Sequence, residues 1–420
     1  MNPIPQHPLV LFSLLVGLAL SSPPRITTSP DLIESTADII QLEEICVIGS
    51  GIHGEDDLLA TPVSIALVGD SLLVLDSKLG GDARLGVFGL DGRLKGDIGG
   101  IGEGPGEYRQ PWALATNTYI GKIYVREAAG GQIHVYSNSG VFERTIRLPI
   151  GGLLADRSQL IQVCESGFIF ILRYEFKPID GSDQGFVRQP VYYKIRQDGS
   201  IADTMRVPTP AEDPFQLIAR SQSSGGLRIG RVPFAPTYHW AISYRGSLVH
   251  GYSSEYLIQV ESDAGNSTVI QRDLLPIAVE RAERTWHKKF ELLGLQVGQD
   301  DWDWNGPPVP RTKPFFQALY PSTDGQIWVL REGDGHAIPG CASEAETIRE
   351  MVDNPCWQSS WFFEVFDETT GGFLGNVDVP EGFREFPRPH ITSDTFTCAV
   401  DDESGAQFVK VFRIRYPEIP

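Results

Sequence analysis

The chain has 420 residues, of which 41% are hydrophobic, with 44 glycines and 30 prolines. A hydrophobic fraction of this size excludes a disordered chain, because it can fill a large core, and the glycines and prolines indicate many turns. The formal net charge of −19 argues against nucleic acid or an anionic membrane surface as a partner, since both would repel the protein.

The N-terminal region contains an unbroken apolar run from Leu9 to Leu20, which is too short to span a bilayer comfortably. Ala19 and Ser21 are the small residues expected at −3 and −1 of a cleavage site, so residues 1–21 are predicted to be a signal peptide. Met1–Pro8 has no lysine or arginine, which leaves an uncleaved anchor or a misassigned start codon as alternatives. We expect a secreted or periplasmic protein with no membrane insertion after cleavage, and a polar leader over residues 22–38.

From residue 39 onward the chain repeats a short strand, a tight turn and an aliphatic run. Most of these runs are followed by a second hairpin, with turns such as Asp91-Gly92 that tolerate positive φ angles. Four strands per unit are typical of a β-propeller, so residues 39–416 are predicted to form an all-β, six-bladed β-propeller of four-stranded blades with small helical insertions. The predicted second strands are Leu72–Asp76, Lys122–Arg126, Phe168–Leu172, Ser247–Tyr252, Gln326–Leu330 and Thr395–Val400.

The last unit is one strand short. Residues 408–416 reach the C-terminal end of the repeat without a returning partner, and the strand predicted at residues 39–48 has no hairpin partner next to it. Pairing the two would close the ring and remove both free edges.

A glycine-rich stretch joins the first two units. It follows the hairpin of Val87–Ile98 and places five glycines in Gly99–Gly106, around Pro105. Because glycine lets one backbone cross closely over another, we expect a crossover from one sheet to the next.

Two consecutive blocks, VFGLDGRLKGDIGGIGEGPGEYRQPWALA and GKIYVREAAGGQIHVYSNSGVFERTIRLP, resemble the six-bladed NHL-like/TolB-like β-propeller proteins of bacterial cell envelopes. In that family a GxGPGE segment followed by Phe or Tyr joins the first two blades. One departure is Arg126-Glu127, where NHL-type repeats usually carry aspartate. The resemblance implies the fold, and most relatives have no assigned activity.

Two short helices and one disulfide are predicted outside the strands. The helix at 277–293 would present an apolar face, and it is interpreted as packing on the propeller or, alternatively, as a lid. The helix at 343–354 would be capped by Ser343 and Glu346, with Ile348 and Val352 inward. Among five cysteines, Cys341 and Cys356 bracket this helix and are predicted to form a disulfide, with two free thiols as the alternative. The residues of the first helical face are Val279, Ala282, Trp286, Phe290 and Leu293.

The mouth of the central channel is the predicted ligand-binding site, because the first residues of each inner strand should line it. The alternative is that the aromatic side chains among the candidate residues fill the hub and leave no site. By the repeat register the inner strands begin at Val63, Trp112, Leu160, His239, Phe316 and His390. The neighbouring candidates are Arg109, Gln110, Tyr238, Trp240, Gln317 and Arg388.

The function expected from these features is a monomeric scaffold that binds a protein or a small-molecule ligand at the channel mouth or a loop face. The sequence contains no GxSxG, HExxH or Walker motif, and catalytic residues are unknown. The alternative is a propeller enzyme of the lactonase or streptogramin-lyase type, which could depend on calcium. A similar fold alone does not establish that the protein catalyses the same reaction.

One segment resembles the beginning of a calcium loop. From Asp301 the chain reads D-x-D-x-N-G, so Asp301, Asp303 and Asn305 are weak alternative metal ligands. Position twelve is Thr312 where a bidentate glutamate is needed, and prolines stiffen the segment. We expect no cofactor and a partly exposed loop whose tryptophans pack on the propeller.

Overall fold

The structure is a computed structural model, which describes residues 25–28, 39–51, 54, 57–77, 83–127, 131–149, 161–178, 186–210, 213–220, 227–263, 265–296, 302–341, 346–402 and 404–417. The predicted signal peptide, residues 1–21, lies outside this part of the chain. Neither helix among these residues has the length and apolar character needed to cross a membrane.

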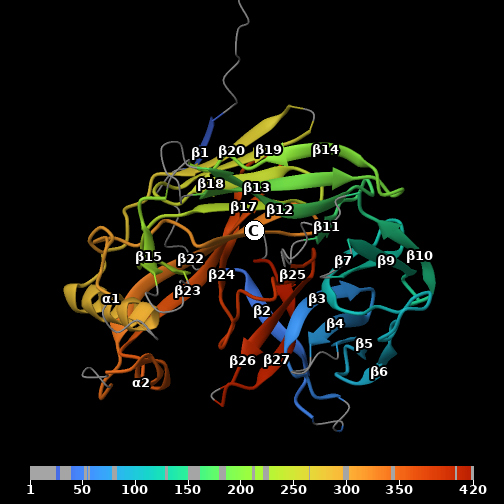
Figure 1. Ribbon diagram of the computed structural model, residues 1–420, viewed down its shortest axis with the longest axis horizontal. Coiled ribbons are helices and arrows are strands. Elements are labelled where there is room, and N and C mark those ends of the chain that lie inside the picture. The colour runs from blue at the N-terminus through green and yellow to red at the C-terminus, as the bar shows by residue number, and fades with distance from the viewer. Residues whose placement is uncertain are drawn as a thin grey trace, which may run out of the picture.

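Six sheets, each built on four antiparallel strands, form a ring and confirm the predicted six-bladed β-propeller (Figure 1). Blades 1 to 3 consist of β3 (Pro62–Val68), β4 (Ser71–Ser77), β5 (Ala83–Gly89) and β6 (Leu94–Asp97); β7 (Pro111–Asn117), β8 (Lys122–Glu127), β9 (Gln132–Ser137) and β10 (Phe142–Arg147); and β11 (Ile161–Val163), β12 (Ile169–Pro178), β13 (Phe186–Ile195) and β14 (Ile201–Arg206). Blades 4 to 6 consist of β17 (Tyr238–Ile242), β18 (Leu248–Tyr252), β19 (Leu257–Glu261) and β20 (Ser267–Arg272); β21 (Ala318–Pro321), β22 (Gln326–Ala337), β23 (Trp357–Asp367) and β24 (Phe373–Asp378); and β25 (His390–Ile391), β26 (Thr395–Asp401), β27 (Gln407–Arg415) and β2 (Gln41–Ile48).

The place of a strand within its blade explains its sequence pattern. Second strands such as β4 and β8 are buried along most of their length, because blades cover both faces, and they read as continuous aliphatic runs. Outer strands such as β10 and β14 expose at least half of their residues. All the runs predicted as second strands overlap β4, β8, β12, β18, β22 and β26.

Apolar clusters between adjacent blades hold the ring together. Between blades 5 and 6, Trp328 stacks on Phe396 with ring centroids 5.4 Å apart, and Phe363 packs against both. Burial of large aromatic side chains at this junction contributes much of its stability, at about 25 cal/mol per Å² of apolar surface.

The ring closes as the sequence predicts. Strand β2 pairs antiparallel with β27, from Gln41 opposite Arg415 to Ile48 opposite Val409. The Glu43 carboxylate accepts from the Arg415 guanidinium at 2.9 Å on the exposed face. On the inner face, Ile48 is fully buried among residues of blade 1. The closing strand therefore joins the last blade to the first.

The glycine-rich stretch is the crossover from β6 to β7. Gly99 has φ +70°, and a Cβ placed on it would lie 2.7 Å from the Gly106 carbonyl oxygen. The Tyr136 hydroxyl donates to that same oxygen at 3.0 Å, and the Tyr108 hydroxyl donates to the Ile98 carbonyl at 3.0 Å. The two backbones therefore approach as closely as the glycine content indicates.

Replacing Gly99 with alanine is expected to lower the free energy of unfolding by about 1–3 kcal/mol, since the φ angle and the close carbonyl both oppose a side chain. Gly100→Ala is the matched control, because a Cβ there would meet nothing within 4 Å. Urea unfolding of both variants measures the difference. Equal stability of the two would show that the crossover relaxes without cost.

A buried carboxylate at the end of the second strand holds the loop that leads into the first strand. In blade 1, Asp76 accepts from the Thr61 N–H at 2.7 Å. In blade 2, Glu127 accepts from the Arg109 N–H at 2.6 Å. Asp76 lies opposite Pro62 and Glu127 opposite Pro111, so the two carboxylates share one register. Glu127 therefore holds this loop in blade 2, as the aspartate expected from the repeat pattern does in blade 1.

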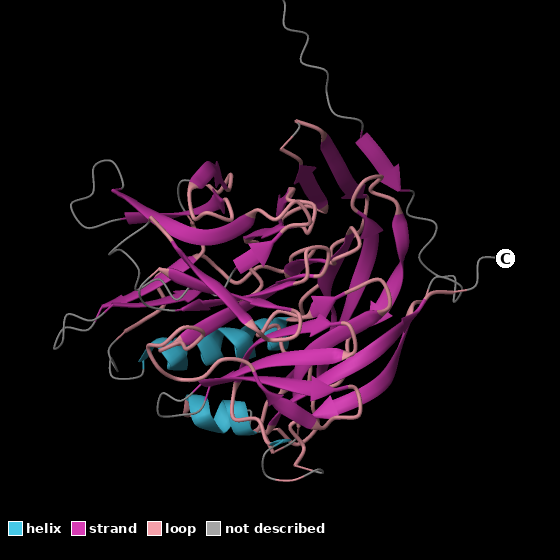
Figure 2. Ribbon diagram, turned by 90° about the vertical axis from the view of Figure 1, so that its right-hand side faces the viewer, coloured by secondary structure: helices cyan, strands magenta, loops and turns pink. Residues whose placement is uncertain are grey.

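Additional elements decorate the ring, and some of them were not predicted from the sequence. The hairpin of β15 (Gln216–Arg220) and β16 (Leu227–Arg231) lies beside α1 (Arg281–Gln296), with α2 (Ile348–Asp353) next to α1 (Figures 1 and 2). Strand β1 (Arg25–Thr28), in the segment expected to be leader, pairs parallel with β20 at the outer edge of blade 4.

The buried face of α1 differs from the predicted one. The helix begins at Arg281, so Val279 precedes it, and Ala282 is exposed. The residues it buries are Glu283 and Leu295, because Glu283 faces a buried lysine and Leu295 packs on the hairpin. Polar pairing, which an apolar pattern does not reveal, thus sets the rotation of this helix.

The second helix also differs from the prediction at its start. Its N-cap is Thr347, whose hydroxyl accepts from the Glu350 N–H at 3.2 Å, in a capping box one turn later than predicted. Met351 is the buried residue, and Val352 is 60% exposed. Cys341 and Cys356 form a disulfide that ties the two ends of the segment together.

Candidate functional site

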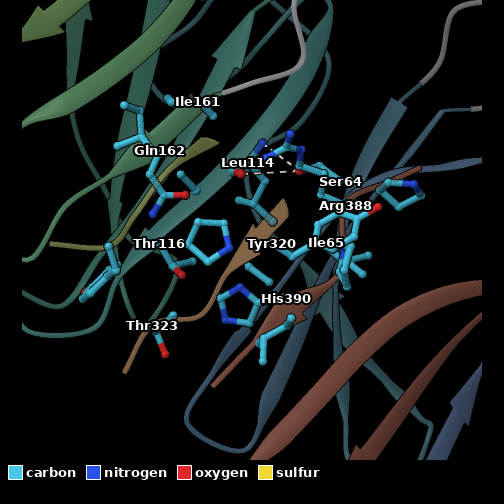
Figure 3. A pocket seen from close by; sticks show the side chains of 18 of the residues that line it. Ser64, Ile65, Leu114, Thr116, Ile161, Gln162, Tyr320, Thr323, Arg388 and His390 are labelled. Atoms are coloured by element: carbon cyan, nitrogen blue, oxygen red, sulfur yellow. Dashed lines mark hydrogen bonds between the residues drawn. The ribbon is translucent and has the colours of Figure 1, made fainter. Parts of the chain in front are cut away.

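The hub of the propeller contains a cavity of about 560 Å³. The first strand of every blade contributes to its wall (Figure 3). This volume lies within the range of small-molecule sites, which is roughly 300–1,000 Å³. The residues from the six strands include Ser64, Thr116, Gln162, Ile242, Tyr320 and His390.

A second cavity of about 260 Å³ adjoins the first at the end where the inner strands begin. Both cavities are lined by Leu172, Tyr174, Tyr320, Glu385 and Arg388, so they meet at this point. Tyrosine rings with polar tips and aliphatic side chains make a wall suited to a ligand that is partly apolar.

Arg388 lies where the two cavities meet. Its guanidinium carbon is 5.8 Å from the centre of the Tyr320 ring, which supports the cation. Its one hydrogen bond among the described residues is a long contact of 3.4 Å from Nη2 to the Trp240 carbonyl oxygen. Pro387 and Pro389 flank the residue and restrict its backbone.

Two histidines lie in the walls, and both are held neutral. Burial, together with the positive charges of Arg231 and Arg388, lowers the pKa of His239 to about 3. Burial lowers the pKa of His390 to about 4. The Nε2 atom of His239 is buried without a hydrogen-bond partner, so it can still accept or donate one.

These histidines are expected to make the fold sensitive to acid. Their folded pKa values lie below the ordinary 6.5, so the unfolded chain takes up protons first as the pH falls. Stability is therefore lost from about pH 6.5 down to about pH 4 through His390 and down to about pH 3 through His239. Replacing His390 with asparagine should reduce this loss, whereas the exposed His336→Gln should not. The urea midpoints of the variants at pH 7, 5.5 and 4.5 measure this loss of stability. If the midpoint of His390→Asn falls with pH as steeply as that of the natural protein, the prediction is wrong.

Among the described residues that line the two cavities, Glu385 is the one carboxylate. Burial raises its pKa, while the charge of Arg388 acts in the opposite direction. No carboxylate among the described residues lies within 4 Å of the Arg388 guanidinium, so Glu385 influences it only at longer range.

A buried ionic cluster supports the wall from behind. Gln317 lines the second cavity, and its amide donates to Glu332 Oε2 at 3.1 Å. Lys313 Nζ donates to Glu332 Oε1 at 2.9 Å and lies 3.2 Å from Glu283 Oε1 of α1. The ammonium group also donates to the Ser359 hydroxyl at 2.9 Å. The decorating helix and the cavity wall are therefore linked through one lysine.

The structure brings some of the predicted mouth residues together and places others elsewhere. Phe316 is fully buried and packs beneath His239, with ring centroids 5.4 Å apart. Arg109, whose side chain pairs with Glu103 on the surface, Gln110 and Trp112 are not among the lining residues. Those that line the cavities are Val63, Tyr238, His239, Trp240, Gln317, Arg388 and His390, while Leu160 lies outside the described residues.

Several residues of the wall were not predicted from the sequence. Tyr174 and Tyr192 come from the second and third strands of blade 3, whereas the repeat register predicts lining residues on inner strands only. Glu385 belongs to the loop before β25, three residues from the predicted Arg388. The sequence signal that could have revealed Glu385 is an acidic and a basic residue, Glu385 and Arg388, just before a predicted inner strand.

The side chains of the segment that resembles a calcium loop make hydrogen bonds and packing contacts within the protein. Asp301 lies outside the described residues, and the Asp303 carboxylate accepts from the Trp304 N–H at 2.7 Å. The Asn305 amide donates to the Ile218 carbonyl at 2.7 Å, and both tryptophans pack on the β15–β16 cluster. Within the described residues, histidine, cysteine and carboxylate side chains nowhere gather in threes as metal ligands would.

Comparison with known proteins agrees with the fold. Residues 54–193, which span blades 1 and 2 and most of blade 3, match the family DUF5128, described as a 6-bladed beta-propeller. No curated protein matches the sequence.

Solved structures with a similar course of the chain share little sequence with it. A Bacteroides fragilis protein predicted to be exported is 13% identical with a TM-score of 0.44, over 93% of this chain and 99% of its own. A DUF4221 family member from Bacteroides vulgatus is 8% identical with a TM-score of 0.42, over 90% and 97%. Virginiamycin B lyase from Staphylococcus aureus is 12% identical with a TM-score of 0.38, over 89% and 99%. The ring of six sheets and the family match together identify the protein as a six-bladed β-propeller.

Proposed function

We propose that the protein is an exported β-propeller scaffold that binds a small molecule in the hub cavity. The observation that carries this proposal is the cavity of about 560 Å³ enclosed by the first strand of all blades. Side chains could have filled the hub, as Phe316 fills the space beneath His239. The wall instead combines apolar surface with a few polar groups, which is typical of a ligand site.

A cavity-filling substitution tests this function. Gln162 is half-buried in β11 and lines the cavity, so Gln162→Trp should occupy it. The neutral dye N-phenylnaphthylamine, which fluoresces in apolar surroundings, serves as the probe because it carries no charge. We expect binding at one site per chain and a loss of affinity of at least about tenfold in the variant.

The control is Ile201→Trp on the outer strand β14 of the same blade, where the isoleucine is 38% exposed. This variant should bind the dye as the natural protein does. Both variants should show unchanged thermal unfolding in the absence of dye. Absence of dye binding, or equal binding by Gln162→Trp, would contradict a ligand site in the hub.

A further inference from the structure

The part of the hub that the structure describes has one fixed positive charge. Among the described residues that line the two cavities, Arg388 is the only lysine or arginine, and the two histidines are held neutral. From the described residues, the guanidinium has no carboxylate within 4 Å and one long hydrogen bond of 3.4 Å. Most of its five N–H donors are therefore available to a ligand.

The surroundings of Arg388 favour a fixed geometry. The Tyr320 ring lies against the guanidinium, and the prolines on either side restrict the backbone. A guanidinium held in place presents two parallel N–H groups, and a carboxylate is the planar anion that matches them. Resting on the hub site proposed above, we propose that the ligand carries a carboxylate group that binds to Arg388 in a bidentate manner.

The charge balance favours a singly charged anion. One guanidinium neutralises one negative charge, and Glu385 in the same wall would repel a second. A phosphate dianion in a partly buried site would need further cationic or backbone donors, and the neutral histidines do not supply the charge. The rest of the wall, which includes Leu172, Ile242 and Tyr192, fits an aromatic or aliphatic body.

Gln317 offers a second polar contact. Its amide N–H is engaged by Glu332 at 3.1 Å, which leaves the amide oxygen as an acceptor on the cavity wall. His239 Nε2 is buried nearby without a partner. A ligand that carries an N–H group beside its carboxylate, such as an N-acylated amino acid, could use these groups as well as Arg388.

The test uses two probes that differ only in the carboxylate, N-acetylphenylalanine and N-acetylphenylalaninamide. Titration calorimetry on the full chain should show the acid binding at least about tenfold more tightly than the amide. Arg388→Gln should abolish this preference and leave binding of the neutral dye intact, and Arg388→Lys should keep part of it. Glu385→Gln should strengthen binding of the acid several-fold, because it removes a repelling charge. The exposed Arg93→Gln is the matched control.

Equal affinity for acid and amide, no binding of the acid, or a preference that survives Arg388→Gln would each overturn the carboxylate assignment. Retained dye binding would in each case leave the proposed hub site standing, so the two proposals fail separately. A peptide C-terminus presents the same group, and a hexapeptide ending in phenylalanine forms a third arm. Its binding in preference to N-acetylphenylalanine would identify a peptide as the source of the carboxylate.

Discussion

Replacing Lys313 with methionine is expected to lower the free energy of unfolding by about 3–5 kcal/mol, because the change leaves buried carboxylates without their cation. The lysine is 2% exposed and serves both Glu332 and Glu283, which are also buried. Urea unfolding measures the loss. The same experiment on Lys122→Met, whose pair with Glu143 is partly exposed, should show a change below about 1 kcal/mol.

Further variants distinguish uncompensated buried charge from loss of side-chain contacts as the cause of the lower stability of Lys313→Met. If uncompensated charge is the reason, adding Glu283→Gln and Glu332→Gln to Lys313→Met should restore part of the stability. If the triple variant is as unstable as the single one, the lysine acts through its hydrogen bonds to Gly333 and Ser359. A loss of under 1 kcal/mol in the single variant would show that the cluster is open to solvent.

Replacing Ile48 with alanine is expected to cost about 2–5 kcal/mol, because this residue fills the junction between the closing blade and blade 1. Thermal and urea unfolding measure the effect. Ile229→Ala is the matched control, since that isoleucine is 59% exposed on β16, and it should change stability by less than about 0.5 kcal/mol.

A second variant addresses closure itself. Gln41 lies opposite Arg415 in the closing pair, so cysteines at both positions are placed to form a disulfide. The oxidised form should unfold at a higher temperature than the reduced form, because it ties the two ends of the ring together. Unfolding at the same temperature would mean that β2 leaves the ring only after the other blades have unfolded.

Much of the ring could be predicted because it repeats. Buried second strands between two blades must be aliphatic throughout, and tight turns require glycine, so both leave a regular trace in the sequence. Closure of the ring could be predicted because the strands expected at residues 39–48 and 408–416 both lacked a partner. The parts that were missed break this regularity: β15 and β16 form a separate hairpin, and the rotation of α1 depends on Glu283, a polar residue inside an apolar pattern.

The candidate site was less predictable for a physical reason. Counting along the repeats placed His239 and His390 at the hub, because inner strands keep their register from blade to blade. Blade 6, however, has an inner strand of only two residues, and the loop before this strand also contributes to the wall, with Glu385. Trp112 was expected to line the mouth from the same register, yet it is not among the lining residues. Which side of a strand faces the hub depends on twist and bulges, such as the irregularity between Pro111 and Ala113.

The pairing of β2 with β27 also has a consequence for the order of folding. During synthesis β2 emerges early, while its partner β27 is made only after the other blades, so β2 stays unpaired until nearly all of the ring has been made. In blades 1 to 5 the four antiparallel strands of each blade are close in sequence and can assemble meanwhile. Until β27 arrives, the backbone edge of β2 lacks its antiparallel partner, although blade 1 can already cover Cys46 and Ile48, and an unpaired strand edge of this kind is prone to aggregation. We therefore expect the last step of folding to be the slowest, and a molecular chaperone to improve the yield most when it acts on chains that are complete but not yet closed.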